Sequence, residues 1–177
     1  MAPAQEELER RLGAVRLLAL DVDGTLTDGG VVWVGSEQLQ RFCVHDGQGL
    51  AWLRKAGVEV TWISGRGCEA TRRRAAELGI AELHLGVGPK QEVLHGVQER
   101  LGIAPEHTLA MGDDVPDLAM AAGAALFAAP ANARPEVRVR ADLVTEARAG
   151  EGAVRELSEI LLRARGAWRG IVGGVAE

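Results

Sequence analysis

The sequence predicts an α/β protein in which a Rossmann-like parallel sheet carries helices on both faces. Short apolar, strand-like runs alternate with helix-like segments nearly to the end of the chain. Acidic residues, hydroxyls and glycines follow several of these runs directly. Repeated β-α units favour a parallel sheet. No linker or internal repeat divides the chain, so we expect residues 1–177 to form one domain.

Composition narrows the classes of function. The net charge is −5, and the aromatic residues are four Trp and two Phe, so neither nucleic acid nor a membrane is expected as a partner. The weakly polar stretch 118–133 contains Gly123 and Pro130 and is too short for a membrane span. Cys43 and Cys68 lack metal-ligand spacing, and no export signal precedes them, which predicts reduced thiols and a cytoplasmic protein.

The first half of the chain predicts a strand, a hairpin insertion and two further β-α steps. After a charged N-terminal helix, the expected strands are 17–20 and 58–63, and the expected helices are 47–55 and 69–78. Gly57 and Gly79 end these two helices. The insertion, about 31–44, is apolar around the turn 35–38 and reads as a β-hairpin. It is too small to be a cap domain.

The second half continues the alternation. The expected strands are 82–85, 108–111, 124–127 and 143–144, and the expected helices are 90–101, 116–122 and 153–165. Gly102 follows one helix, and Pro116 suits the first turn of another. Residues 166–177 are expected to form a C-terminal tail.

The segment Asp21-Val22-Asp23-Gly24-Thr25 is the most informative in the chain. It follows the apolar run 15–20, so two carboxylates end a strand that is expected to be buried. Carboxylates removed from water need a cation or several hydrogen-bond donors. In an α/β sheet, ligands bind at the carboxyl ends of the strands. The segment therefore predicts a Mg²⁺ site with a nucleophilic carboxylate.

Three further groups follow predicted strands and should reach the same edge of the sheet. They are Ser64-Gly65-Arg66, Lys90 and the segment 112–117, which contains Asp113, Asp114 and Asp117. Carboxylates with a divalent ion, next to a cation and a hydroxyl, make a phosphoryl-transfer site. Each of these residues could instead have a structural role that involves no ligand.

Those alternatives are local structural roles. Ser64 could cap a helix, Lys90 could lie at the surface, and Asp114 and Asp117 could be first-turn carboxylates. For Asp114 and Asp117, this choice is even.

In this order and spacing, the four groups resemble the motifs of the haloacid dehalogenase superfamily, from Leu17 to about Arg155. The resemblance implies that Asp21 is the nucleophile and Asp23 the general acid and base. It also implies Mg²⁺ bound by Asp21, the Asp23 carbonyl and Asp113. Phosphoryl oxygens would be held by catalytic Lys90 and by Ser64, Gly65 and Thr25, with Asp114 and Asp117 in support.

A closer resemblance is to the 3-deoxy-D-manno-octulosonate 8-phosphate phosphatase family. It covers residues 21–29, the hairpin, His45-Asp46-Gly47-Gln48-Gly49, 63–66, 78–80 and 152–156. The family lacks a large cap and forms homotetramers through its hairpins, which would explain apolar Trp33, Val34 and Phe42. It implies a small phosphorylated sugar acid as substrate, contacted by Arg66 and Arg74, in lipopolysaccharide synthesis.

The sequence leaves two alternatives to this function. The family often has Gly-Gly-Arg-Gly before the last helix, whereas this chain has Glu151 in Ala149-Gly150-Glu151-Gly152. A nonulosonate 9-phosphate or another small sugar phosphate therefore stays open as the substrate. A receiver-like binding module also uses Mg²⁺, Asp, a hydroxyl and Lys, but here the lysine precedes the second acidic cluster, which disfavours that class.

Overall fold

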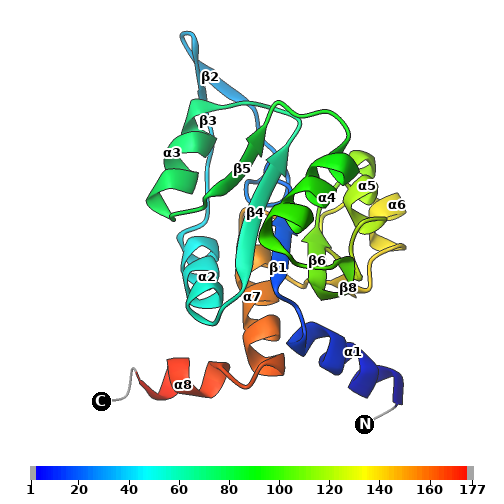
Figure 1. The fold of residues 1–177 in the computed structure, drawn as a ribbon. Helices are drawn as coiled ribbons and strands as arrows, with labels where there is room; N and C mark the ends of the chain where they lie inside the picture. The colour runs from blue at the N-terminus through cyan, green and yellow to red at the C-terminus, as the bar shows by residue number, and fades with distance from the viewer. Residues whose placement is uncertain (1–2, 175–177) are drawn as a thin grey trace.

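The computed structural model describes residues 3–174 and contains a six-stranded parallel sheet in the order β5-β4-β1-β6-β7-β8 (Figure 1). The strands are β1 (Leu17–Leu20), β4 (Glu59–Ser64), β5 (Glu82–Leu85), β6 (Thr108–Met111), β7 (Leu126–Ala129) and β8 (Leu143–Val144). In the centre, Leu17 of β1 pairs with Glu59 and with Thr108. All strands run the same way, so their carboxyl ends share the upper edge in Figure 1. The predicted α/β class is confirmed.

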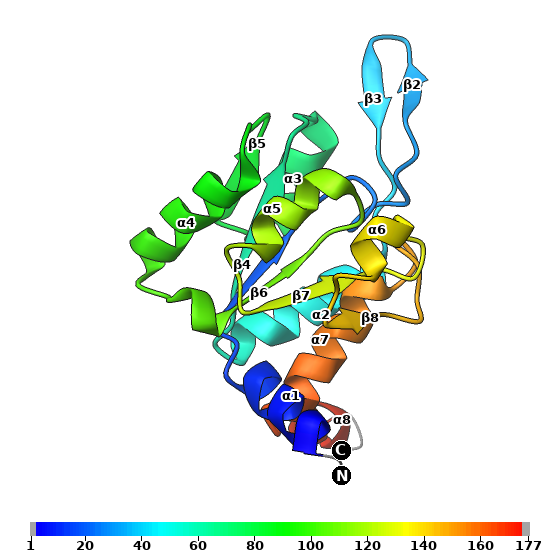
Figure 2. The same ribbon diagram turned by 90° about the vertical axis from the view of Figure 1, so that its right-hand side faces the viewer.

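Helices cover both faces of the sheet (Figures 1 and 2). One face carries α1 (Pro3–Gly13), α2 (Val44–Lys55), α3 (Glu69–Glu77) and α7 (Ala153–Ala164). The other carries α4 (Lys90–Leu101), α5 (Leu118–Ala121) and α6 (Pro135–Arg138). Outside α2 and α7 lies α8 (Trp168–Gly173), and two 3₁₀ turns complete the set, η1 (Pro105–His107) and η2 (Val115–Asp117).

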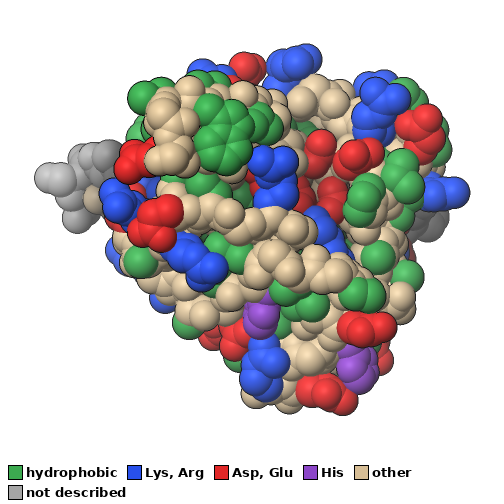
Figure 3. All heavy atoms as spheres, turned by 90° about the horizontal axis from the view of Figure 1, so that it is seen from above, with side chains coloured by type: hydrophobic (Ala, Val, Ile, Leu, Met, Phe, Trp, Pro, Cys, Tyr) green, Lys and Arg blue, Asp and Glu red, His purple; other side chains and the backbone are tan. Residues whose placement is uncertain are grey.

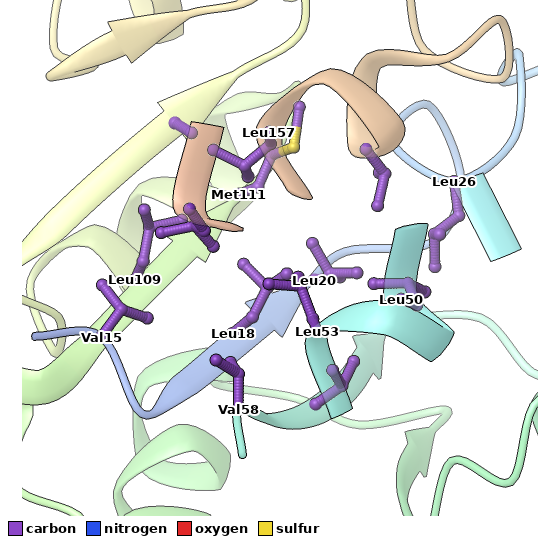
Figure 4. Close-up of a cluster of buried hydrophobic side chains, with 14 of the residues drawn as sticks. Val15, Leu18, Leu20, Leu26, Leu50, Leu53, Val58, Leu109, Met111 and Leu157 are labelled. Atoms are coloured by element: carbon purple, nitrogen blue, oxygen red, sulfur yellow. The ribbon is translucent and has the colours of Figure 1, made fainter. Parts of the chain in front are cut away.

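The core forms because successive strand residues point to opposite faces. In β1, Leu18 and Leu20 join the cluster under α2 and α7, whereas Leu17 and Ala19 join the cluster under α4 and α5. Figure 4 shows the first cluster closing around β1. All four side chains are 0% exposed. Each such leucine stabilises the fold by roughly 1.5–3 kcal/mol, and together they fix the end of β1 where Asp21 begins.

The hairpin of β2 (Val32–Val34) and β3 (Glu37–Leu39) stands away from the sheet at its carboxyl edge (Figure 2). Val34 pairs with Glu37, so the turn is Gly35-Ser36, shorter than the predicted 35–38. Gly35 takes φ +61°, a conformation that suits glycine. Within residues 3–174 the hairpin is the sole insertion at this point, and no cap domain accompanies it.

Several predicted boundaries differ from the observed ones. The predicted strand 124–127 is β7 at Leu126–Ala129, and the predicted helix 47–55 begins earlier, at Val44. The predicted helix 116–122 is the turn η2 followed by α5. Neither α6 nor α8 was predicted; α8 lies in the expected tail.

The chain ends of the described region lie on the side of the molecule opposite the hairpin (Figure 1). Of the predicted N-terminal helix, Met1 and Ala2 lie outside the described residues, as do 175–177 of the tail. Among the helices that the structure describes, none is both long and apolar enough to cross a bilayer.

Candidate active site

The end of β1 opens into a cavity of about 190 Å³ at the carboxyl edge of the sheet. The cavity is lined by Asp21, Asp23, Ser64, Gly65, Arg66, Lys90, Asp113, Asp114, Pro116 and Asp117. Seen from above, acidic and basic side chains gather around a hollow on this face (Figure 3). The four strand-end groups that the sequence predicted at one edge therefore do meet. Val22, between the two aspartates, is fully buried in the core.

Lys90 is buried at the centre of this cluster. It is the first residue of α4, and its side chain is 9% exposed. Its Nζ lies 2.5 Å from Asp21 Oδ1 and 2.6 Å from Asp117 Oδ1. Burial lowers the pKa of Lys90, but Asp21 and Asp117 outweigh this effect, so the pKa is raised and the ammonium stays charged. The surface-lysine alternative is therefore wrong.

Asp117 holds both Lys90 and the loop that carries Asp113. Its Oδ2 accepts hydrogen bonds from the backbone N–H of Asp113 at 2.9 Å and of Asp114 at 3.1 Å. A Cβ at Gly112 would collide with the Asp117 side chain, so glycine permits this approach. Asp114, in contrast, is exposed, and its Oδ1 accepts from Val115 N at 2.8 Å. The structure thus gives Asp117 a link to Lys90 and Asp114 a capping contact.

Asp113 approaches the end of β1 through a gap that a glycine leaves. Gly24 has φ +98°, and a Cβ there would collide with the Asp113 carboxylate. The Thr25 hydroxyl lies 3.5 Å from Asp113 Oδ1. Burial first, then Asp117 and Asp114, raise the pKa of Asp113 to about 6. Asp113 therefore lies close to other carboxylates, and a bound cation would reduce the repulsion among them.

Three carboxylates in this group could hold a divalent ion. Oxygens of Asp21, Asp113 and Asp117 lie within 4.8 Å of one another. Asp21 Oδ2 is buried and has no hydrogen-bond partner in residues 3–174. Burial first, then Asp117, raise the pKa of Asp21 to about 7 against the opposing effect of Lys90. An all-oxygen donor set with an unpartnered buried oxygen fits a hard cation such as Mg²⁺.

The predicted ligands were the carboxylates of Asp21 and Asp113 and the backbone carbonyl of Asp23, and the structure adds the Asp117 carboxylate to the two acidic ones. Both Asp117 oxygens already accept from Lys90 or from backbone amides, so Asp117 is the least available of the three. The Asp23 side chain is engaged elsewhere. Its Oδ2 accepts from Ser64 Oγ at 3.2 Å, and Ser64 Oγ itself accepts from Arg66 N at 3.0 Å.

Sequence reasoning missed one contact of Asp23. Its Oδ1 accepts a hydrogen bond from Gln40 Nε2 at 2.9 Å. Gln40 lies between the hairpin and α2, and nothing in its sequence neighbourhood signals a partner. Gln40 and Arg41 both lie between apolar Leu39 and Phe42, so the polarity pattern does not single out Gln40.

The predicted arginines separate in space. Arg66 lines the cavity and is exposed, with its guanidinium 3.4 Å from Gln38 Oε1. Arg74 pairs with Glu77 at 2.8 Å and lies over Gly47 of α2, so it is not part of the cavity lining. Glu151 is also outside the lining; it is exposed and lies 3.8 Å from Arg41. Among the arginines of residues 3–174, only Arg66 lines this cavity.

Comparison with known proteins agrees with this geometry. A family model described as haloacid dehalogenase-like hydrolase matches residues 88–157. The chain is 38% identical over 166 residues to the 3-deoxy-D-manno-octulosonate 8-phosphate phosphatase KdsC of Escherichia coli, covering 93% of this chain and 88% of that protein. It is 34% identical to the protein of the same name from Yersinia pestis, covering 97% and 92%.

A solved structure extends the likeness to three dimensions. The 3-deoxy-D-manno-octulosonate 8-phosphate phosphatase of Moraxella catarrhalis, in complex with magnesium, phosphate and KDO, superposes with a TM-score of 0.93. Sequence identity to it is 33%, and the match covers 96% of this chain and 98% of that one.

Fold, site and relatives together define a hydrolase of the haloacid dehalogenase-like class. Within that class, the chain belongs to the 3-deoxy-D-manno-octulosonate 8-phosphate phosphatase family. The receiver-like alternative is therefore set aside.

Proposed function

We propose that this protein is a Mg²⁺-dependent phosphatase that hydrolyses 3-deoxy-D-manno-octulosonate 8-phosphate. The observation that carries the proposal is the Asp21–Lys90–Asp117 cluster, with Asp113 beside it, at the mouth of β1. Supporting it, the relatives bear that activity in their names, and a similar structure holds magnesium, phosphate and the product sugar acid.

Two carboxyl groups carry the proposed reaction. A carboxylate oxygen of Asp21 attacks phosphorus while the bond from phosphorus to the sugar oxygen breaks, and Asp23 gives its proton to that oxygen. Water then attacks the phosphorus of the Asp21 acyl phosphate and loses a proton to Asp23. The bond between phosphorus and Asp21 breaks, which releases phosphate and restores both side chains.

The approach of Asp21 to a phosphate is opposed by charge. At 4 Å and an effective dielectric of 20, two unit charges repel by about 4 kcal/mol. Lys90, 2.5 Å from Asp21, offsets part of this repulsion. Mg²⁺, held by Asp21 and Asp113 and the Asp23 carbonyl, would supply further positive charge to the phosphoryl oxygens. Ser64, Gly65 and Thr25 are proposed to hold those oxygens.

The substrate needs more room than the cavity in a single copy provides. About 190 Å³ suits a phosphoryl group, whereas binding sites for small molecules usually occupy about 300–1,000 Å³. A second cavity of about 390 Å³ lies under the hairpin, and Gly67 and Cys68 of the Ser64 loop line it. Arg66 stands between the two and is proposed to receive the carboxylate of the sugar acid.

A homotetramer is part of the proposal, and the hairpin supports it. Val32, Trp33, Val34 and Leu39 are 54%, 61%, 61% and 48% exposed. An apolar patch of this kind marks an interface. Phe42 does not belong to it, because it stacks on core Trp62 with centroids 6.2 Å apart. Neighbouring copies would also enlarge the site, and Arg74 is proposed to act there.

Phosphate release from a panel of substrates tests the activity. The purified protein with Mg²⁺ should release phosphate fastest from 3-deoxy-D-manno-octulosonate 8-phosphate, ahead of a nonulosonate 9-phosphate and simple sugar phosphates. A preference for the nonulosonate 9-phosphate would make that compound the assigned substrate. Glu151 would then be the first residue to replace by mutation. No release from any keto-sugar acid phosphate would overturn the proposal.

Light scattering tests the assembly. Trp33→Glu places a charge on the hairpin patch and should convert tetramers into smaller species. Val139→Glu is the matched control, since Val139 is 81% exposed on α6's C-terminal side, away from the hairpin. A tetramer that survives Trp33→Glu would contradict the hairpin interface.

We also propose a cytoplasmic location and a place in lipopolysaccharide precursor synthesis, which cell fractionation and a deletion strain would test.

A further inference from the structure

The Asp23 side chain is held from the far side of the hairpin, late in the connection from β1 to α2. Gln40 follows β3 of the hairpin and is half-buried. Its Nε2 donates to Asp23 Oδ1 at 2.9 Å. Because Ser64 Oγ donates to the other oxygen, both Asp23 oxygens are bound, one from the core domain and one from the hairpin segment.

Gln40 is itself fixed in orientation. The Thr71 hydroxyl, on α3 and 2% exposed, donates to Gln40 Oε1 at 2.6 Å. Asp23 Oδ1 accepts from the amide, so the NH₂ of Gln40 faces Asp23 and its carbonyl faces Thr71. The Thr71 hydroxyl, which can donate or accept, donates to that carbonyl and so anchors the Gln40 side chain in place. The chain of contacts runs Thr71 to Gln40 to Asp23.

We propose that Gln40, anchored by Thr71, is a positioning residue that aims the Asp23 carboxyl at the leaving-group oxygen. The inference rests on the proposed function, in which Asp23 transfers a proton to the departing sugar oxygen. Proton transfer needs heavy atoms within about 2.6–3.2 Å, so a carboxyl free to rotate would spend less time in a productive geometry. Ser64 alone holds just one of the two oxygens.

A purely structural role for Gln40 predicts something different. In that case the amide would tether the hairpin, and its loss would affect stability, assembly and every substrate alike. A positioning role predicts an effect confined to substrates whose leaving group needs a proton. Alkyl phosphates need one, whereas 4-nitrophenyl phosphate releases a stable phenolate and does not.

The test compares kcat/KM for the sugar acid phosphate with kcat/KM for 4-nitrophenyl phosphate in Gln40→Met, which keeps the side-chain length without polar atoms. For each substrate, kcat/KM reports the steps up to and including departure of the leaving group. We expect kcat/KM for the sugar acid phosphate to fall about tenfold, which is a fraction of the full effect of general acid catalysis. The value for 4-nitrophenyl phosphate should stay within about twofold of wild type. Equal losses on both substrates, or no loss, would overturn the proposal.

A second pair of variants guards against misfolding of the hairpin. Thr71→Val removes the hydroxyl at nearly constant volume, and Thr71→Ser retains it. We expect Thr71→Val to show the same selective loss, smaller than that of Gln40→Met, and Thr71→Ser to behave as wild type. If both Thr71 variants behave alike, the hydroxyl does not act through Gln40.

Asp21→Asn separates this inference from the proposed function. If Asp21→Asn is inactive on both substrates while Gln40→Met is normal, only the role of Gln40 is lost. If Asp21→Asn remains active, the proposed mechanism itself fails.

Discussion

Two buried aspartates, Asp21 and Asp46, share the features by which a functional carboxylate is usually recognised. They are 5% and 1% exposed, and in each the Oδ2 atom has no hydrogen-bond partner among residues 3–174. Burial is the main reason that the pKa is raised in both, to about 7 for Asp21 and about 6 for Asp46. By burial and pKa alone the two would be ranked together.

Their surroundings differ. Asp21 faces the Lys90 ammonium and two more carboxylates beside a cavity. Asp46 lies in the first turn of α2, and its Oδ1 accepts from Arg155 N, in the first turn of α7, at 2.7 Å. It therefore joins two helix starts, whose amides favour a negative charge, although burial outweighs this effect. The comparison teaches that convergence of several groups on one cavity, more than a shifted pKa, marks the site.

The largest expected difference between the two aspartates is in activity. Asp21→Asn removes the nucleophile and should lower kcat by about a thousandfold or more. Asp46→Asn should leave kcat within about threefold, because Asp46 does not line the cavity. Steady-state kinetics on the two variants, with folding checked by circular dichroism, measures this. Comparable losses in both would erase the distinction.

Replacement of Lys90 should lower the free energy of unfolding, because the acidic cluster would lose its positive charge. Lys90→Gln leaves Asp21, Asp113 and Asp117 without their ammonium, and breaking a buried ion pair in this way costs about 3–5 kcal/mol. Chemical denaturation without Mg²⁺ gives the free energy of unfolding. Combining Lys90→Gln with Asp21→Asn should recover part of the loss, since one of the facing charges is gone. A double variant no more stable than Lys90→Gln would argue against the charge explanation.

Mg²⁺ should stabilise the folded protein through Asp21 and Asp113. At a concentration one hundred times the Kd, a ligand that binds only the folded state adds about 2.7 kcal/mol. The midpoint of thermal unfolding should therefore rise with added Mg²⁺ in wild type and fall back with a chelator. Asp113→Asn should lose most of this rise, whereas Asp46→Asn should keep it. An equal rise in the two variants would show that the ion binds elsewhere.

The smallest effect concerns the pH dependence of stability. The pKa of Asp46 is raised in the folded protein, from an ordinary value of 3.8 to about 6. The folded state therefore binds this proton more tightly, so the ionised carboxylate costs stability above pH 6, and the cost vanishes below about pH 4.

Asp46→Asn removes this titrating carboxyl while keeping the size of the side chain. Relative to wild type, the variant should gain about 2–3 kcal/mol of unfolding free energy between pH 4 and pH 7.5, by linkage. Urea denaturation at the two pH values measures the difference. If the difference in unfolding free energy between variant and wild type were the same at both pH values, ionisation of Asp46 would not destabilise the folded protein.

Much of the site was predictable because it depends on strand ends. Once a parallel sheet is assumed, Asp21, Ser64, Lys90 and Asp113 must approach one another, whatever the details of the helices. Two features of the sequence supported this assumption: the apolar runs are short, and acidic residues, hydroxyls or glycines follow several of them directly. The bounds of β1, β5, β6, β8 and α4 agree with the prediction for the same reason.

The rest depends on packing that local pattern does not encode. The contact of Gln40 with Asp23 spans the hairpin, whose path back to the sheet is set by tertiary contacts. The strand β7 lies in an alanine-rich run with no change of polarity to mark its start, and its prediction missed by two residues. Trp168 of α8 packs edge-on against Trp52, 5.7 Å away, and this partner is invisible in the tail sequence alone.

The central claim is that Asp21, unlike Asp46, forms a covalent bond to phosphorus. Acid quenching during turnover, followed by mass spectrometry of proteolytic fragments, tests it directly. The account predicts one phosphoryl group on the fragment containing Asp21, absent from Asp21→Asn and stronger when Asp23 is replaced so that hydrolysis slows. A phosphoryl group on any other residue, or none while phosphate is being released, would contradict it.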